Sequence, residues 1–435
     1  MKTNLRTTLG IAAAIFSLTF VSCQNESLDY FGQTASSRIQ ESLESARKVL
    51  LEAENGWAME YFTASGGYNY AIRFIGTDTQ GNPIDSLVAA SELSYREPVG
   101  SYFRLTTDDG PILSFDTYNE VLHYFATPDS DNYQAYGGDF EFIILSATED
   151  EVVLKGKRTG YISRMTPIRS GDILSVSQEA GLNSDKFVVL SASGFVNGER
   201  ALVEFDLAMR NIIISGYQDD GQVDKANQII EPFIITGDGV KFVDEIEAFG
   251  ARFNSITVNQ ARTKLLISGV ESSLNIDPVP SGYTLFKDFP GNYIFTYQTG
   301  EGKTVSRNVT LSISDQMNKY IMLSGFSNDY GIEFSYSYTD GCLHFYPQYV
   351  GELSSTDLVA VFTSDGNVVS NAAGIDLISD GNGGYRFKDN PNDRFYASYM
   401  VLFRDYEAED GMWYYDQFFG WSPSLFIPKT LTRVR

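Results

Sequence analysis

The sequence predicts a mainly β protein, made of antiparallel sheets in sandwich or barrel-like form, with one α-helix near the N-terminus. Aromatic residues are frequent, with 27 Tyr and 30 Phe among 435 residues. They alternate with Thr, Ser and Val in short runs, which turns rich in Gly, Asn and Asp separate. Such alternation is typical of antiparallel strands joined by hairpins. A helical period is clear in one place only.

That helix is predicted over residues 37–54. Ser36 or Ser37 can cap its start, and Asn55-Gly56 can end it. Its apolar residues recur three and four positions apart, on one face of a helix. They are Ile39, Leu43, Ala46, Leu50 and Ala53.

We expect the rest of the chain to be β. Period-two alternation predicts strands at 57–63, 68–75, 102–106, 112–115, 140–145, 152–155, 186–191, 201–207 and 211–215. The turn Asp108-Asp109-Gly110-Pro111 indicates a hairpin between two of them.

A domain boundary is predicted at 276–282, where Pro278 and Pro280 favour an extended connector. The helix and a β domain would then occupy 36–275, and a second β domain 283–435. Segments 113–124 and 334–345 align without a gap, since both read apolar-Ser-aromatic, polar turn, Leu-His-aromatic. This similarity indicates duplicated β units, with chance similarity of two hairpins as the alternative.

The N-terminus predicts export and lipid anchoring. Lys2 and Arg6 precede an apolar run from Leu9 to Val21, and the small Ser22 then precedes Cys23. We interpret 1–22 as a lipoprotein signal peptide, Cys23 as the residue that carries lipid such as palmitate, and 23–35 as a polar tether. The alternative is an ordinary cleaved signal with a chance cysteine. The expected location is the outer membrane, at the cell surface, with the periplasmic face as the alternative.

Charge and cysteine content narrow the partners. The formal net charge of −24 repels phosphate backbones, so we expect no nucleic-acid partner. The only cysteines are Cys23 and Cys342, so a lipidated Cys23 leaves no pair for an internal disulfide. Cys342 is predicted to be a small buried hydrophobic residue.

Catalytic motifs are absent from the sequence. There is no Gly-rich phosphate loop, nucleophile elbow or CxxC pair. The only histidines, His123 and His344, lie between apolar residues in predicted strands, and we expect each to hydrogen-bond a turn. We therefore predict no catalytic residue, no metal ligand and no cofactor. A pair of carboxylates placed by the fold for glycoside hydrolysis is not excluded.

The segment 411–421 is the candidate for ligand contact, because rings there surround a carboxylate and an amide. Flat rings can stack on sugar faces, while the polar groups bind hydroxyls. The alternative is that the rings fill the core of the last hairpin. The candidate residues are Trp413, Tyr414, Tyr415, Asp416, Gln417 and Trp421.

Four segments carry a family resemblance: LLEAENGW at 50–57, GPILSFDTYNEVLHYF at 110–125, GGDFEFIIL at 137–145 and VVLKGKRTG at 152–160. With the N-terminal signal, they resemble a Bacteroidota lipoprotein family catalogued only as a domain of unknown function. Its members are often encoded beside Sus-like outer-membrane uptake components. The resemblance implies the cell envelope and nutrient capture, and it supplies no activity or site residues.

The leading hypothesis is an accessory ligand-binding lipoprotein of an outer-membrane nutrient-uptake system. Its partners would be the membrane, through the lipid, a glycan or peptide ligand, and an outer-membrane transporter complex. One alternative is a glycosidase-like hydrolase that uses paired carboxylates. The other is a structural subunit that docks on a transporter complex. Of these classes, we favour a binding protein over an enzyme.

Overall fold

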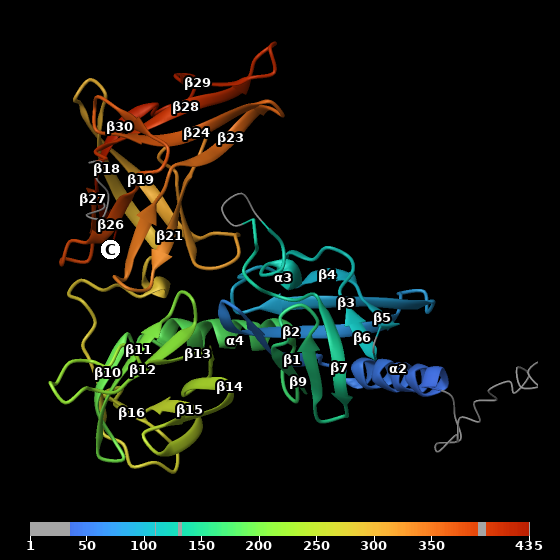
Figure 1. Ribbon diagram of the computed structural model, residues 1–435. Helices are drawn as coiled ribbons and strands as arrows, with labels where there is room; N and C mark the ends of the chain where they lie inside the picture. Colours follow the sequence, from blue (N-terminus) through green and yellow to red (C-terminus); the bar gives the residue numbers. More distant parts are fainter. Residues whose placement is uncertain (1–34, 109, 129–132, 390–396, 435) are drawn as a thin grey trace, which may run out of the picture.

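The fold consists of three antiparallel sheet systems and two longer α-helices, of 18 and 14 residues. This arrangement confirms the predicted fold class. The computed structural model describes residues 35–108, 110–128, 133–389 and 397–434. Figure 1 shows the three sheet systems as separate bodies in contact. The predicted signal peptide, Cys23 and almost all of the tether lie outside the described residues. Among the described residues, no helix combines the length and apolar character needed to cross a membrane.

Helix α2 (Ala35–Glu52) packs on the first sheet, close to its predicted bounds. Leu43, Ala46 and Leu50 are buried, as the apolar spacing predicts. The helix ends before Gly56, whose φ of +93° lets the chain turn into the first strand. There, the indole nitrogen of Trp57 donates a hydrogen bond to the Leu50 carbonyl at 3.0 Å.

The first sheet has nine strands in the order β4-β3-β2-β1-β9-β8-β7-β6-β5. One face carries a core of aliphatic and aromatic side chains, against which α2 packs. The strands are β1 (Trp57–Thr63), β2 (Gly66–Thr77), β3 (Pro83–Ser91), β4 (Val99–Tyr102), β5 (Arg104–Thr107), β6 (Pro111–Ser114), β7 (Glu141–Ala147), β8 (Val152–Gly156) and β9 (Ile162–Pro167).

The second sheet is a closed barrel in which β10 to β17 pair in chain order. Its interior is a separate aliphatic and aromatic core. The strands are β10 (Ser191–Val196), β11 (Glu199–Asp206), β12 (Asn211–Ser215), β13 (Ile229–Ile235), β14 (Gly239–Ala248), β15 (Ala251–Val258), β16 (Lys264–Leu266) and β17 (Leu274–Ile276).

The third sheet follows the path β18-β19-β20-β21-β22-β26-β27-β30-β28-β24-β23. An additional β18–β30 pairing closes the first part of this path into a ring around a core rich in Phe and Tyr. Its elements are β18 (Gly291–Thr299), β19 (Thr304–Ile313), β20 (Tyr320–Ser324), β21 (Ile332–Ser337), β22 (Cys342–Phe345), β23 (Gln348–Ser354), β24 (Asp357–Ser364), β25 (Val369–Ser370), β26 (Ile375–Ser379), β27 (Tyr385–Asp389), β28 (Tyr399–Glu407), β29 (Trp413–Gln417) and β30 (Leu425–Arg433).

Two helical segments contradict the prediction that all later elements are β. Helix α4 (Ile173–Lys186) begins at Asp172, whose side chain and Ser175 form a capping box. Its sequence is largely polar, with three Ser among its 14 residues, so no strong apolar period indicated a helix. The short α3 (Glu120–His123) begins at Asn119, whose side chain accepts hydrogen bonds from the amides of Val121 and Leu122.

The helix α3 also changes the interpretation of the aligned segments. Segment 334–345 forms the predicted hairpin, from β21 into β22. Segment 113–124 instead runs from the end of β6 into α3. The predicted hairpin is wrong for the first segment, because Asn119 caps a helical turn where Asp340 occupies a strand-to-strand turn.

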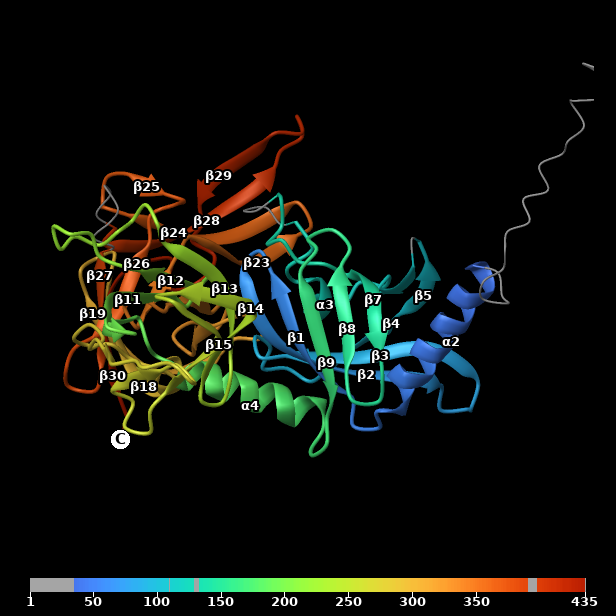
Figure 2. The ribbon, with the colours of Figure 1, turned by 60° about the horizontal axis from the view of Figure 1, so that its bottom comes forward.

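The connector between the barrel and the third sheet runs from β17 to the short 3₁₀-helix η1 (Phe286–Asp288). The predicted linker 276–282 lies in this stretch, and the predicted N-terminal unit, 36–275, holds both the first sheet and the barrel. The domain boundaries themselves stay a prediction. Figure 2 shows α4 running beneath the first sheet and the barrel.

Candidate functional site

The predicted ligand segment forms an exposed hairpin of β28 and β29. Among the described strands, β29 pairs with β28 alone, and in Figure 1 the hairpin extends from the body of the third sheet. The rings of Trp413, Tyr414 and Tyr415 are 45%, 44% and 53% exposed. The segment therefore does not fill a core at these three positions.

The strand register divides the candidate residues between two faces. Side chains alternate along a strand, and residues paired across two strands share a face. Trp413, Tyr415 and Gln417 lie on one face, and Tyr414 and Asp416 lie on the other. The residues that form one cluster in the sequence therefore divide into two smaller groups on opposite faces of the hairpin.

The first face continues across the neighbouring strands of the same sheet. Gln417 pairs with Phe403, Phe403 with Ala360, and Ala360 with Tyr349, so Tyr349 shares this face. The Tyr349 ring is 56% exposed. We call the exposed rings of Tyr349, Trp413 and Tyr415, together with Asp405 and Gln417, the aromatic face.

Asp405 lies beneath these rings and is 4% exposed. Its Oδ2 accepts a hydrogen bond from the Tyr349 hydroxyl at 2.5 Å. This bond is the main reason why the pKa of Tyr349 is raised to about 12. Its Oδ1 is buried and has no hydrogen-bond partner among the described residues. An unpaired buried carboxylate oxygen is costly, so this position beneath the rings is a strained point of the face.

The opposite face is occupied by internal pairs. Arg404 forms a bidentate ion pair with Asp357, and its guanidinium lies 4.6 Å from the Tyr406 ring centroid. The Tyr406 hydroxyl donates to Asp416 at 3.0 Å, and the Tyr414 hydroxyl donates to Asp410 at 2.9 Å. These groups satisfy one another, so this face offers less to a ligand.

Trp421 packs against the core of the third sheet and is not part of the aromatic face. Its ring stacks on Tyr330 with 6.0 Å between centroids and packs edge-to-face with Phe418, at the border of the C-terminal core. Gly351 lies so close to the ring that a Cβ there would be 2.4 Å from it. We therefore assign Trp421 to packing.

The two histidines have different environments. His123 is buried in α3, not in a strand, and stacks on Phe140 at 5.2 Å. Its Nδ1 lies 3.2 Å from the backbone nitrogen and oxygen of Asn119, which caps that helix. The expected strand position is wrong, because α3 replaces the strand, but a turn contact is present.

His344 lies in β22 as expected, yet its partners are side chains rather than a turn. Its Nδ1 is 2.5 Å from Oδ1 of Asp376, and its Nε2 is 3.9 Å from Sγ of Cys342. The pKa of His344 is raised to about 10. The hydrogen bond with Asp376 is the largest cause, and the contact with Cys342 is the second largest. Cys342 is buried, as predicted, but it also faces an imidazole.

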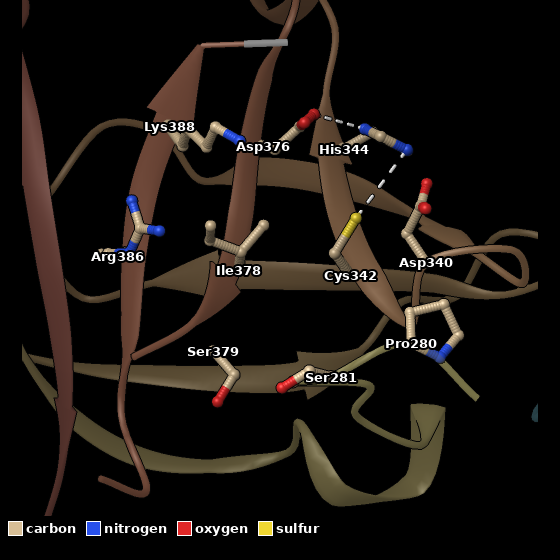
Figure 3. A pocket seen from close by; sticks show the side chains of 11 residues that line it. Pro280, Ser281, Asp340, Cys342, His344, Asp376, Ile378, Ser379, Arg386 and Lys388 are labelled. Carbon is tan, nitrogen blue, oxygen red and sulfur yellow. Dashed lines mark hydrogen bonds and ion pairs between the residues drawn. The ribbon is translucent and has the colours of Figure 1, made fainter. Parts of the chain in front are cut away.

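These residues line a pocket of about 470 Å³, shown in Figure 3. Strands β22, β26 and β27 form its floor, and the connector at Pro280 to Gly282 forms a wall. The opposite face of the three strands belongs to the core. The lining residues are Pro280, Ser281, Gly282, Asp340, Cys342, His344, Asp376, Ile378, Ser379, Arg386 and Lys388.

The sequence did not indicate this pocket, because its parts come from four separated segments. His344 pairs with Asp376, and Asp376 pairs with Lys388, only through strand register. The local signal was the spacing of Cys342 and His344, which places both side chains on one face of a strand.

The described residues define a mainly β protein with two candidate sites, the aromatic face and the pocket. The chain belongs to the family described as a domain of unknown function, DUF4302, whose model matches residues 28–260. Residues 272–396 match a second domain of unknown function, DUF4987. Membership in a family of unknown function is therefore confirmed, whereas the Bacteroidota origin and the link to Sus-like components stay predictions.

Other comparisons add no functional information. A search of curated proteins finds no match. A protein of unknown function from the DUF3598 family of Nostoc punctiforme is 9% identical, with 89% of this chain and 99% of that chain covered and a TM-score of 0.14. A "putative 6-phosphogluconolactonase" from Bacteroides fragilis is 12% identical, with 86% and 99% covered and a TM-score of 0.11. At these TM-scores, neither likeness bears on fold or function.

Proposed function

We propose that this protein is a lipid-anchored protein of the cell envelope that binds a glycan on its aromatic face, as an accessory component of outer-membrane nutrient uptake. The observation that carries the glycan proposal is the set of three half-exposed rings, Tyr349, Trp413 and Tyr415, on one face of one sheet. Trp413 and Tyr415 stand on the projecting β28–β29 hairpin and Tyr349 on β23, and rings exposed to this degree do not fill the core.

The polar groups between the rings favour a sugar over a purely apolar ligand. Sugar rings offer C–H faces that stack on aromatic rings and hydroxyls that need hydrogen-bond partners. Gln417 supplies an amide beside the rings, and buried Asp405 orients the hydroxyl of the exposed Tyr349. The net charge of −24 favours a neutral glycan over an acidic one.

The test is binding of the full chain to a panel of neutral soluble polysaccharides, measured by affinity electrophoresis and calorimetry. Trp413→Ala and Tyr415→Ala should each weaken binding about tenfold, which corresponds to the upper range for one aromatic contact. Tyr414→Ala is the matched control, because Tyr414 is on the same strand with similar exposure but points to the opposite face.

Two results would contradict the glycan proposal. One is that Tyr414→Ala weakens polysaccharide binding as much as Trp413→Ala and Tyr415→Ala do. That result would indicate that the hairpin acts only through its fold. The other is failure of every polysaccharide while a peptide library binds, which would favour strand addition at the edge of β29.

The anchor is tested separately, since Cys23 lies outside the described residues. A signal peptide followed by Cys23 supports lipidation, and two or more acyl chains hold a protein stably on a membrane. Labelled palmitate should be incorporated into the full chain and not into Cys23→Ser, which should appear in the soluble fraction. Protease digestion of intact cells then distinguishes the cell surface from the periplasmic face.

A further inference from the structure

We propose that Asp340, Cys342 and His344 bind one divalent transition-metal ion of the zinc class in the pocket beneath the connector. The three residues each offer one ligand atom, and these atoms all lie within 4.8 Å of one another. Nothing in the glycan proposal requires this site, and the two are tested independently.

The strand places the three ligands on one side. Cys342 and His344 are two positions apart in β22, so their side chains point to the same face. Asp340 precedes the strand by two residues and lines the same pocket. In Figure 3, the side chains of all three lie together at one end of the pocket.

The separation of sulfur and nitrogen fits a shared metal. Zn–S and Zn–N bonds of about 2.3 and 2.0–2.1 Å at a tetrahedral angle put the two ligand atoms about 3.5 Å apart. The observed distance from Cys342 Sγ to His344 Nε2 is 3.9 Å. A shift of a few tenths of an ångström would therefore bring these two atoms to the tetrahedral separation, and the Asp340 oxygen lies within 4.8 Å of both.

Asp376 orients the imidazole as in known metal sites. It holds Nδ1 of His344 at 2.5 Å and so leaves Nε2 facing Cys342. A carboxylate on the far nitrogen of a metal-ligating histidine fixes the ring and raises its basicity.

The turn that carries Asp340 is fixed by its neighbour Gly341. Gly341 has a φ of +61°, and a Cβ there would lie 2.5 Å from the Tyr283 ring, so only glycine fits. Its amide donates to the Ser337 carbonyl at 2.9 Å, and its carbonyl accepts from the Thr284 amide at 3.0 Å. The connector and the turn therefore stabilise each other through these contacts, and Asp340 is held at the pocket.

The ligand chemistry selects the metal. Thiolate, imidazole and carboxylate together suit zinc and its neighbours in the first transition series, while Mg²⁺ and Ca²⁺ require oxygen ligands. Three protein ligands leave a fourth position open, as in exchangeable zinc sites. Arg386 and Lys388 line the same pocket, so an anionic fourth ligand is favoured.

The test uses Co²⁺ as a spectroscopic probe on the full chain carrying Cys23→Ser, in which Cys342 is the only thiol. After removal of metal with a chelator, one equivalent of Co²⁺ should produce a thiolate-to-cobalt charge-transfer band and the visible bands of four-coordinate cobalt. One equivalent of Zn²⁺ should abolish both, and Mg²⁺ should leave them unchanged.

The variants separate the roles of the residues. Cys342→Ser should remove the charge-transfer band, and His344→Ala should abolish tight binding. Asp376→Asn should keep the spectrum but weaken Co²⁺ binding by roughly 10- to 100-fold, since it acts on the ligand and not on the metal. His123→Gln, which changes the only other histidine, is the matched control and should bind normally.

Circular dichroism of each variant should match the parent protein, which ensures that a loss of binding is not a loss of fold. The proposal is overturned if the folded Cys23→Ser protein gives no charge-transfer band with Co²⁺. It is also overturned if the band survives in Cys342→Ser, or if His123→Gln loses the metal as fully as His344→Ala does.

Discussion

Glu92 and Arg210 form a fully buried ion pair between two different sheets, with 3.1 Å from Oε2 to Nη2. Glu92 follows β3 of the first sheet, and Arg210 lies between β11 and β12 of the barrel. The same Nη2 donates to the Ser184 hydroxyl of α4 at 2.9 Å, and the other oxygen of Glu92 accepts from the Asn69 amide at 2.9 Å. One ion pair therefore connects the sheet, the barrel and the helix.

The first prediction concerns the stability of this pair. Glu92→Gln leaves the Arg210 guanidinium buried without a counter-charge, so we expect the free energy of unfolding to fall by roughly 3–5 kcal/mol. The control is Glu247→Gln, whose exposed pair with Arg252 should contribute no more than about 1 kcal/mol. Chemical denaturation of the full chain measures both. Equal losses in the two variants would show that burial does not set the cost.

The second prediction concerns Asp185 and Lys319, which join α4 to the third sheet as a buried pair. Desolvation lowers the pKa of Lys319, so its charge depends on Asp185. We expect Lys319→Met alone to destabilise the fold more than the double variant with Asp185→Leu, because the double variant leaves no unpaired charge. Denaturation of the four proteins of this cycle measures the coupling. If the losses of unfolding free energy in the two single variants simply add in the double variant, the predicted coupling is wrong.

The third prediction is a pH dependence from His123. Burial is the main cause that lowers its pKa below 6.5 in the folded state. Above pH 6.5 the residue is neutral in both states and adds no pH dependence. As pH falls below 6.5, the unfolded chain binds the proton first, so the folded state loses stability until pH passes the lowered pKa.

The measurement is thermal unfolding of the parent and of His123→Gln between pH 5 and 8. The difference between the two proteins should change with pH, with the parent losing more stability on the acid side. A difference that stays constant across this range would show that His123 titrates alike in both states. Comparison of the two proteins cancels the common titration of the carboxylates.

The fourth prediction concerns Gly341. Gly341→Ala places a Cβ at a left-handed φ and 2.5 Å from the Tyr283 ring, so it should destabilise the fold by more than the roughly 1–2 kcal/mol of the backbone effect alone. Gly302→Ala is the control, because Gly302 has a φ of +80° with nothing within 4 Å of its Cβ. Denaturation compares the two, and equal losses would rule out the Tyr283 contact as a cause.

The fold class and α2 were predictable because both depend on local patterns. Alternation marks a strand, and the spacing from Leu43 to Leu50 marks a buried helix face, whatever lies elsewhere in the chain. Helix α4 was not predictable in this way, because capping at Asp172 and burial between two sheets stabilise it rather than an apolar period. The hairpin at 113–124 failed for a similar reason, since one capping residue, Asn119, changes a strand into a helical turn.

The two sites show the same difference between local sequence signals and contacts that depend on strand pairing. We predicted a single ligand segment, whereas strand pairing divides Trp413, Tyr414 and Tyr415 between two faces. The contribution of Tyr349 depends on the pairing of β23 with β24. In the pocket, Cys342 and His344 carry a local signal. Asp376 does not, because only the pairing of β22 with β26 brings it to the imidazole.

The connector between the barrel and the third sheet does more than join them. Pro280, Ser281 and Gly282 supply a wall of the pocket, and Tyr283 packs on the turn of Asp340, so the connector and the third sheet build the pocket together. A fragment that begins at β18 would lack this wall. A cut in this short stretch of chain would open the pocket to solvent without touching Cys342, His344 or Asp376.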